Sequence, residues 1–435
     1  GGRGVAPTAR LISIQVMSQS ISGGCPPNCL VSYASDQMLG LERVLDLADR
    51  FDIAAANISI GGGAFDTTCD LDERKRVIDN LLSRNIATVV ASGNGGFDGA
   101  VIAPGCIPTA VTVGATTKQD TLAEFSNHAR MVDLLAPGVD ITTPTHDGTP
   151  DGVVTVSGTS LAAPHVAGAW ALLMQAKPDA RADDVLRALA CTGELVARNN
   201  LPLPRIDLAA ALAFLRNPVT QRRWTFRTDA QVRRWTQHHG QWRRLRDLFH
   251  VVSDGTTVWQ LASSPFCASD VEVVAKVRRI DPDRKWNSGL VLFSATDTSG
   301  SFGGLWFAFA RNGYGDDEHG YATIWALDAV DGVTGDWQAR QLCRNDRADA
   351  VRYQGWNTLR VVSRDGTHSF FINGGLVCDA VERRISAGDV AVAMAAPAAG
   401  HVYDVDSVTA VSLAPLEPVD LPPWQQHPPY RRAVP

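Results

Sequence analysis

The sequence predicts an α/β domain built on a parallel sheet, followed by an all-β sandwich. Short apolar runs alternate with amphipathic segments of helical period up to about residue 217, which is typical of a parallel sheet covered by helices on both faces. From about residue 222 to residue 413, strand-like runs are separated by turn dipeptides, which is typical of antiparallel sheets. A chain of 435 residues that is 45% hydrophobic can form two cores.

The first domain, residues 1–217, contains six short apolar runs that we predict to be strands. Two segments between them, residues 37–50 and 72–84, carry apolar side chains at helical spacing, such as Leu41, Val44 and Leu45 in the first of them. The predicted strands are residues 11–16, 54–60, 86–91, 110–113, 132–135 and 153–156.

Ser160 follows the last of these runs, within the sequence S-G-T-S-L-A-A-P-H-V-A-G, and precedes an apolar helical stretch that Lys177 and Pro178 close. Ser160 is thus predicted to lie at a helix N-terminus, where unpaired N–H groups and the helix dipole favour negative charge. Pro164 is compatible with the first helical turn. A hydroxyl at such a position is a candidate nucleophile for acyl transfer.

This serine motif resembles the signature of subtilisin-like peptidases, and three further stretches match that family in order. They are G-V-A-P-T-A-R-L at residues 4–11, N-I-S-I-G-G at 57–62 and A-S-G-N at 91–94, so the resemblance extends to about residue 215. It implies a three-layer subtilisin-like domain and a serine endopeptidase in which Ser160 is the nucleophile and Asn94 donates to the oxyanion. The residues that would pair with an extended polypeptide substrate are Ser59, Ile60, Gly61, Ala91, Ser92 and Gly93.

Each of these positions also has a structural interpretation. Ser160 fits a helix N-cap, Asn94 suits the left-handed backbone of a glycine-rich turn, and residues 61–63 suit a flexible turn. The collinear order of four motifs favours the functional interpretation.

The sequence lacks a recognisable base for Ser160. The family has its aspartate motif, D-[ST]-G, and its histidine motif, H-G-T-H, before G-V-A-P, and neither occurs in residues 1–435. We therefore expect an incomplete record of a longer peptidase, inactive and poorly stable as this chain alone; the alternative is a pseudoprotease. His165 is expected to pack within its helix, and His128 and His146 to be solvated loop residues.

Six strands are predicted in the second domain, residues 222–413. W-N-T-L-R-V at 356–361, F-F-I-N-G at 370–374 and G-Q-W at 240–242 resemble parts of concanavalin-like jelly rolls. Members of that superfamily bind glycans or proteins, or serve as spacers, so the fold does not decide the function. The predicted strands are residues 271–277, 289–294, 304–309, 321–327, 356–363 and 369–372.

Possible partners of the second domain are a glycan or a protein. Trp306, Trp325, Trp337 and Trp356 suit a sugar-stacking surface, although strand alternation favours core packing for any one of them. Eight arginines in residues 222–246 are interpreted as a solvated face, because a net charge of −6 argues against a nucleic-acid binder. No apolar run reaches the roughly 18 residues of a membrane span, and the proline-rich residues 414–435 are predicted to be disordered.

Eight cysteines favour an oxidising compartment and an extracellular location. Cys25 with Cys29, Cys69 with Cys106, and Cys343 with Cys378 are the expected disulfides, and Cys191 is expected to be a buried free thiol. A metal site is the alternative for Cys25 and Cys29, but no second pair has ligand spacing. We predict no cofactor; calcium follows only from the family resemblance, because no EF-type loop is present.

Overall fold

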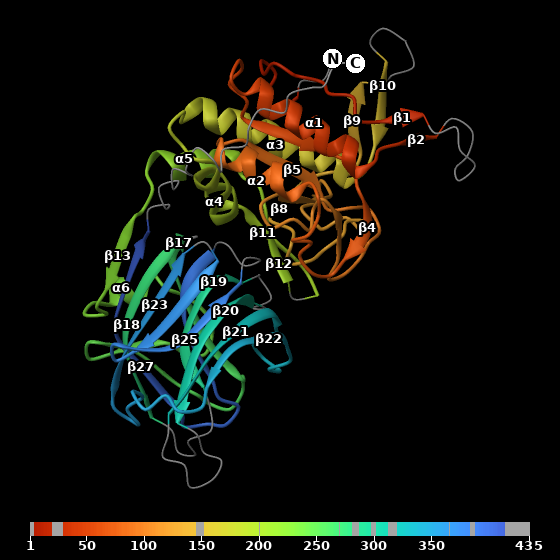
Figure 1. Ribbon diagram of the computed structural model, residues 1–435. Helices are drawn as coiled ribbons and strands as arrows, with labels where there is room; N and C mark the ends of the chain where they lie inside the picture. The colour runs from red at the N-terminus through yellow and green to blue at the C-terminus, as the bar shows by residue number, and fades with distance from the viewer. Residues whose placement is uncertain are drawn as a thin grey trace.

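The computed structural model shows an α/β part and a β-sandwich part, joined end to end (Figure 1). It describes residues 4–19, 29–144, 152–199, 201–268, 270–280, 287–296, 302–311, 320–364, 366–382 and 388–413. The predicted disordered tail at 414–435 lies outside these residues. The last helix of the α/β part ends at Arg216 and the first strand of the sandwich begins at Gln221.

A six-stranded sheet, ordered β11-β12-β8-β7-β5-β3, forms the centre of the α/β part. All neighbours from β3 to β12 are parallel, and only β11 runs antiparallel to its partner. Four of the predicted strands form β3, β5, β7 and β8. The strands are β3 (Ala55–Ile58), β5 (Ala87–Ala91), β7 (Val111–Thr116), β8 (Leu134–Pro137), β11 (Glu194–Arg198) and β12 (Leu201–Arg205).

Helices cover both faces of this sheet, which confirms the predicted α/β architecture. Every residue of β5 is buried. Val90 packs with Leu81 of α2 on one face, whereas Val89 packs with Val166 of α3 on the other, because successive strand residues point to opposite faces. The helices are α1 (Ala34–Leu47) and α2 (Lys75–Ser83) on the first face, and α3 (Thr159–Ala176), α4 (Ala182–Thr192) and α5 (Leu208–Arg216) on the second.

Two predicted strands differ from expectation. Residues 11–16 form no strand and pair with no neighbour among the described residues; Val16 instead packs against α1 at Gly40. β10 (Val153–Val156) does form, but it pairs with β9 (Ile141–Pro144) in an exposed antiparallel hairpin outside the parallel sheet. The valines of β10 are exposed, so the strand reflects the β propensity of branched side chains and not burial in a core. Two further short pairs join β1 (Ser18–Gln19) to β2 (Leu30–Val31) and β4 (Gly62–Phe65) to β6 (Val101–Ala103).

Two antiparallel sheets pack face to face in the second part, and all six predicted strands are present. Their common core contains residues of both sheets, such as Val273 and Val361 from one and Leu290 and Phe307 from the other. One sheet holds β13 (Gln221–Trp224), β15 (Arg243–Leu245), β16 (Leu248–Val252), β27 (Val402–Ser412), β18 (Val271–Ile280), β23 (Trp356–Arg364), β24 (Thr367–Ile372) and β25 (Gly375–Val381). The other holds β14 (Thr236–His239), β17 (Trp259–Ala268), β26 (Gly388–Ala395), β19 (Ser288–Thr296), β20 (Phe302–Arg311), β21 (Gly320–Val330) and β22 (Trp337–Asn345), and the short helix α6 (Asp229–Val232) precedes β14.

A disulfide joins the two parts, which corrects the prediction for Cys191. Cys191 at the end of α4 is bonded to Cys267 of β17, with a Cα–Cα distance of 5.7 Å, and is not a free thiol. The spacing of the cysteines in the sequence carried no signal for this pair, because the two residues lie 76 positions apart in different domains. Arg187 of α4 also donates to the Ser412 hydroxyl of β27 at 2.9 Å.

The remaining cysteines follow the predictions where the structure describes them. Cys69 is bonded to Cys106, and Cys343 of β22 to Cys378 of β25. Cys29 is disulfide-bonded, while its predicted partner Cys25 lies outside the described residues. No helix in the described ranges is long and apolar enough to cross a membrane.

Candidate functional site

Ser160 lies in the first turn of α3, which Gly158 precedes as the N-cap residue. Ser59, just beyond the carboxyl end of β3, donates its hydroxyl to the backbone carbonyl of Ser160 at 2.9 Å, and Asn57 donates to the Ser59 hydroxyl at 3.0 Å. These bonds tie the start of α3 to the end of the sheet. The Ser160 hydroxyl itself has no hydrogen-bond partner within the described ranges.

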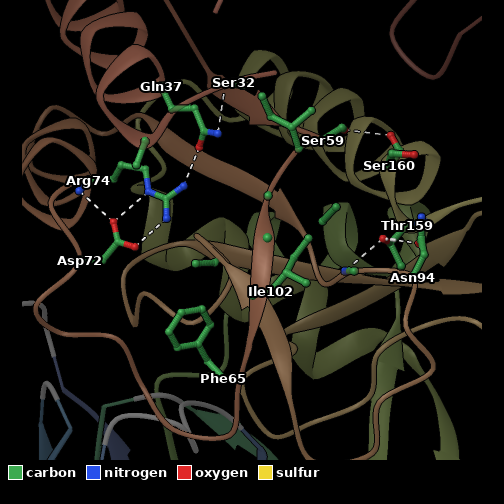
Figure 2. A pocket seen from close by; sticks show the side chains of 18 of the residues that line it. Ser32, Gln37, Ser59, Phe65, Asp72, Arg74, Asn94, Ile102, Thr159 and Ser160 are labelled. Carbon is green, nitrogen blue, oxygen red and sulfur yellow. Dashed lines mark hydrogen bonds and ion pairs between the residues drawn. The ribbon is translucent and has the colours of Figure 1, made fainter. Parts of the chain in front are cut away.

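Asn94 faces the same helix N-terminus from the loop after β5. Its carboxamide oxygen accepts hydrogen bonds from the backbone N–H and the hydroxyl of Thr159, each at 2.8 Å. A Cβ atom placed on Gly158 would lie 2.9 Å from Ser160 Oγ and 3.2 Å from Asn94 Nδ2, so both atoms border one small volume beside the glycine. Figure 2 shows Asn94, Thr159 and Ser160 together at one end of the pocket. The structure thus brings the predicted nucleophile and the predicted oxyanion donor together.

Asn127 supports the loop that carries Asn94, and our sequence reasoning missed it. Its side chain is fully buried; it accepts from the N–H groups of Gly95 and Phe97 at 2.9 and 3.1 Å and donates to the Ser92 carbonyl at 2.9 Å. Three bonds from one side chain therefore fix both sides of the Asn94 turn. A polar residue between two predicted strands gave no indication of this role.

A cavity of about 810 Å³ extends from Ser160 past the carboxyl ends of β3 and β5, which are adjacent parallel strands. Such strand ends are the usual position of ligand sites in parallel sheets. Seven of the eight predicted site residues line it: Ser59, Ile60, Gly61, Ala91, Gly93, Asn94 and Ser160. Outside the strand ladders, no backbone–backbone hydrogen bond involves residues 59–61 among the described residues.

Ser92 does not fit its predicted substrate-binding role. It is fully buried and does not line the cavity. Its N–H donates to the Val113 carbonyl, its carbonyl accepts from Ile102 N–H and Asn127, and its hydroxyl donates to the Asn127 carbonyl. Ser92 has no backbone group left for a ligand because the strand that continues into it is already enclosed by the sheet and the neighbouring loop.

Polar residues at the opposite end of the cavity were not predicted. Figure 2 shows Ser32, Gln37, Asp72 and Arg74 there, with Phe65 below them. Gln37 and Arg74 are only 5% and 6% exposed. Gln37 is the first residue of one predicted amphipathic helix and Asp72 is the first residue of the next. Their polar side chains at these positions were the only sign in the sequence of a polar cluster.

The ring nitrogens of His128 and His165 bond to groups other than Ser160. His165 Nδ1 lies 2.7 Å from the Leu161 carbonyl one helical turn before it, which agrees with the predicted packing role. His128 is not a solvated loop residue: its side chain is fully buried between Asp98, at 3.2 Å, and the Leu201 carbonyl, at 3.0 Å. Burial lowers the pKa of His128 below its ordinary value. His146 lies outside the described residues.

No group of three or more His, Cys, Asp or Glu side chains suited to a metal ion occurs in the described ranges.

In the second part, Trp306 is fully buried against Trp259, with ring centroids 4.5 Å apart. Trp337 is 42% exposed and lies beside Trp325, with the ring centroids 5.1 Å apart and the ring planes tilted by 46°. Trp356 lies under Lys276 and Arg278. The eight arginines of residues 222–246 are exposed, as the solvated-face interpretation expects.

Comparison with known proteins identifies the family that the first part of the chain matches. Residues 1–203 match the model of the subtilase family. This part of the chain is a subtilase domain. An extracellular serine proteinase of Thermus sp. (strain Rt41A) is 41% identical over 136 residues, covering 31% of this chain and 32% of the relative. Alkaline serine exoprotease A of Vibrio alginolyticus is 35% identical over 172 residues, covering 40% of this chain and 28% of the relative.

The chain spans about a third of the length of these curated relatives. Among solved structures, a cold adapted subtilisin-like serine proteinase is 32% identical with a TM-score of 0.33, and the match covers 38% of this chain and 56% of that chain. Residues 1–203 are therefore recognised as a subtilase domain from their sequence.

Proposed function

We propose that this protein is a secreted serine endopeptidase that cleaves polypeptides through an acyl-enzyme on Ser160. The observation that carries the proposal is the pairing of Ser160, in the first turn of α3, with an Asn94 carboxamide whose oxygen is held by Thr159. That arrangement leaves Asn94 Nδ2 as a donor beside the serine hydroxyl. The disulfides and the extracellular relative support the location.

In the proposed reaction, Ser160 Oγ attacks the peptide carbonyl carbon and its proton passes to a base. The carbonyl oxygen gains the negative charge, and Asn94 Nδ2 and the Ser160 N–H stabilise it at the positive end of α3. The C–N bond then breaks, and the amine takes the proton from the base. Water attacks the acyl-enzyme in the same way and releases the second product.

The substrate is proposed to be an extended polypeptide that pairs with residues 59–61. Main-chain pairing of this kind binds many sequences, because the hydrogen bonds are made to backbone groups. Ser59 fixes the position of this segment relative to Ser160 through its bond to the Ser160 carbonyl.

A catalytically inactive binding protein is the second candidate, and one observation favours it. Within the described ranges no histidine is hydrogen-bonded to the Ser160 hydroxyl, whereas a serine nucleophile needs a base within reach. Such a pseudoprotease would retain the peptide-binding segment and lack turnover.

For the second part we propose a concanavalin-like jelly roll that acts as an accessory module. Its support is the packing of two antiparallel sheets around one core, together with the sequence likeness at residues 356–374. Glycan binding has less support than the peptidase function, because Trp306 and Trp259 are buried in the module.

Hydrolysis of an unfolded protein such as reduced casein tests the peptidase proposal. The protein expressed from its complete gene is expected to release peptides, and its Ser160→Ala variant is expected to release none while unfolding at the same temperature. Equal turnover by the variant would exclude Ser160 as the nucleophile. A folded wild-type protein without turnover would establish the pseudoprotease.

A further inference from the structure

The cavity that begins at Ser160 ends at a buried polar cluster formed by Ser32, Gln37, Asp72 and Arg74. Gln37 lies in the first turns of α1, and Arg74 is the residue that precedes α2. Figure 2 shows this polar cluster on the opposite side of the pocket from Ser160 and Asn94. One continuous cavity therefore joins the proposed reaction centre to a charged group.

Arg74 is held in a defined orientation within the polar cluster. Its Nε donates to Asp72 Oδ1 at 2.8 Å, one terminal nitrogen donates to Asp72 Oδ2 at 2.6 Å, and the other donates to Gln37 Oε1 at 2.6 Å. Hydrogen bonds from the Arg74 guanidinium hold the pKa of the Asp72 carboxyl below its usual range, so Asp72 is ionised at neutral pH. A buried charge pair of this kind is costly to desolvate, which argues for a specific use.

Hydrogen-bond donors remain in excess at this end of the cavity. The bonds above use three of the five guanidinium N–H groups, and each Asp72 oxygen already accepts from Arg74. Gln37 gives its oxygen to Arg74 and one amide hydrogen to the Ser32 hydroxyl at 3.3 Å, which leaves its second amide hydrogen. Two guanidinium N–H groups, one amide N–H and the Ser32 O–H thus have no acceptor among the described residues.

The path between the two ends suits an extended side chain. Gly61 and Gly62 line it without side chains, and a Cβ on Gly62 would meet nothing within 4 Å. A Cβ on Gly61 would lie 2.2 Å from the Ala103 carbonyl, so the close approach of the two backbones requires glycine there. Phe65 and Ile102 also line the cavity and add apolar surface to it.

We infer that the polar cluster is a specificity subsite that binds a substrate side chain ending in a hydrogen-bond acceptor, as in Glu or Gln. The methylene groups of that side chain would pack on Phe65 and Ile102, and its terminal oxygen would accept from Arg74, Gln37 and Ser32. A Leu side chain has no acceptor for these donors. The ammonium group of Lys would place further donors against them. The inference rests on the proposed function, because it takes the ligand to be a peptide bound along residues 59–61.

Equilibrium binding to the Ser160→Ala variant of the whole chain tests the inference without relying on turnover. The probes are blocked, fluorescein-labelled alanine octapeptides that carry Glu, Gln, Leu or Lys at each position in turn, measured by fluorescence polarisation. At one position the Glu and Gln peptides are expected to bind about ten-fold more tightly than the Leu peptide, and the Lys peptide most weakly.

Gln37→Glu provides the decisive variant. It keeps the acceptor for Arg74 but adds a negative charge, so the Lys peptide is expected to become the tightest at that same position. Leu39→Glu, which adds the same charge on the same helix at a side chain that is 59% exposed, is expected to keep the preference for Glu and Gln. Unchanged thermal unfolding of both variants verifies their folds.

The possible failures are distinguishable. Equal binding of all peptides at every position would overturn the subsite and leave the peptidase proposal intact. Failure of every peptide to bind the folded protein would contradict both the subsite and the proposed substrate-binding segment. Retention of the Glu preference in Gln37→Glu would show that the polar cluster does not contact the side chain.

Discussion

The carboxamide oxygen of Asn94 is fixed by Thr159, which donates both its backbone N–H and its hydroxyl to that oxygen at 2.8 Å. Thr159 is fully buried, and its hydroxyl also accepts from the Gly93 N–H at 3.2 Å. One residue of the nucleophile helix thus orients the donor on the neighbouring loop. The relationship makes Thr159 a positioning residue for the proposed oxyanion site.

Replacement of Thr159 by Val should lower kcat on peptide substrates by about ten-fold with little change in KM. The substitution keeps the shape of the side chain but removes one of the two bonds to Asn94, so the donor Nδ2 loses orientation. Asn94→Ala removes the donor itself. It should lower kcat by about 100- to 1,000-fold, which is the usual effect of removing one oxyanion-hole donor. Steady-state kinetics of the protein from its complete gene measures both values. Thr155→Val on the exposed hairpin is the matched control; a Thr159→Val effect confined to KM would contradict the positioning role.

Asn127→Leu should lower the free energy of unfolding by at least about 2 kcal/mol. The substitution leaves the N–H groups of Gly95 and Phe97 without their acceptor, and each buried unsatisfied group costs about 1–3 kcal/mol. Urea unfolding measures the change. Asn80→Leu on α2, whose side chain has no hydrogen bond among the described residues, is the control, and an equal loss in both variants would show that Asn127 is not special.

Much of the fold could be predicted from the residue pattern alone. Residues 86–91 and 110–113 are short runs buried on both faces, and such runs indicate parallel strands covered by helices. Residues 153–156 show the limit: four β-branched or apolar residues predict a strand, but only the tertiary arrangement shows that the strand is an exposed hairpin.

The candidate site was predictable where the motif specifies the backbone, as at Ser160 and Asn94. It was not predictable where contacts come from distant segments. Asn127 donates a hydrogen bond to Ser92, which lies 35 positions earlier in the chain. Arg74 donates one to Gln37, which lies 37 positions earlier. The backbone of Ser92 and the thiol of Cys191 were misjudged for the same reason, because their partners lie on elements that sequence spacing does not bring together.

Removal of the disulfide between the two parts should uncouple their unfolding. In the chain-entropy description, closing a loop of 76 residues contributes about 4 kcal/mol. The double variant Cys191→Ser with Cys267→Ser is therefore expected to show two calorimetric transitions in place of one, with the lower one shifted to lower temperature. Cys343→Ser with Cys378→Ser, a pair within the second part, should destabilise that part only. A single unshifted transition in the first variant would contradict the role of the disulfide as a coupling element.

Asp133 should make the protein less stable as the pH rises from about 4 to about 7. Burial raises the pKa of its carboxyl to about 7, above the ordinary value of 3.8, so folding favours the protonated form. The resulting stability is complete below the unfolded pKa and is lost as the pH rises through the folded pKa. Asp133→Asn keeps an acceptor for the Thr112 N–H, which donates to Asp133 at 2.7 Å, and should unfold at a higher temperature than wild type at pH 8 but not at pH 4. If the melting temperatures of wild type and variant change with pH in the same way, Asp133 makes no contribution to the pH dependence of stability.

Covalent labelling by a fluorophosphonate probe tests the central claim most directly, because the probe reacts with an activated serine and its adduct mimics the oxyanion. The protein expressed from its complete gene is expected to carry one adduct per molecule, which peptide mass spectrometry assigns to Ser160. Asn94→Ala should slow the labelling, and Ser160→Ala should abolish it. A folded protein that remains unlabelled, or an adduct on a serine other than Ser160, would contradict the account.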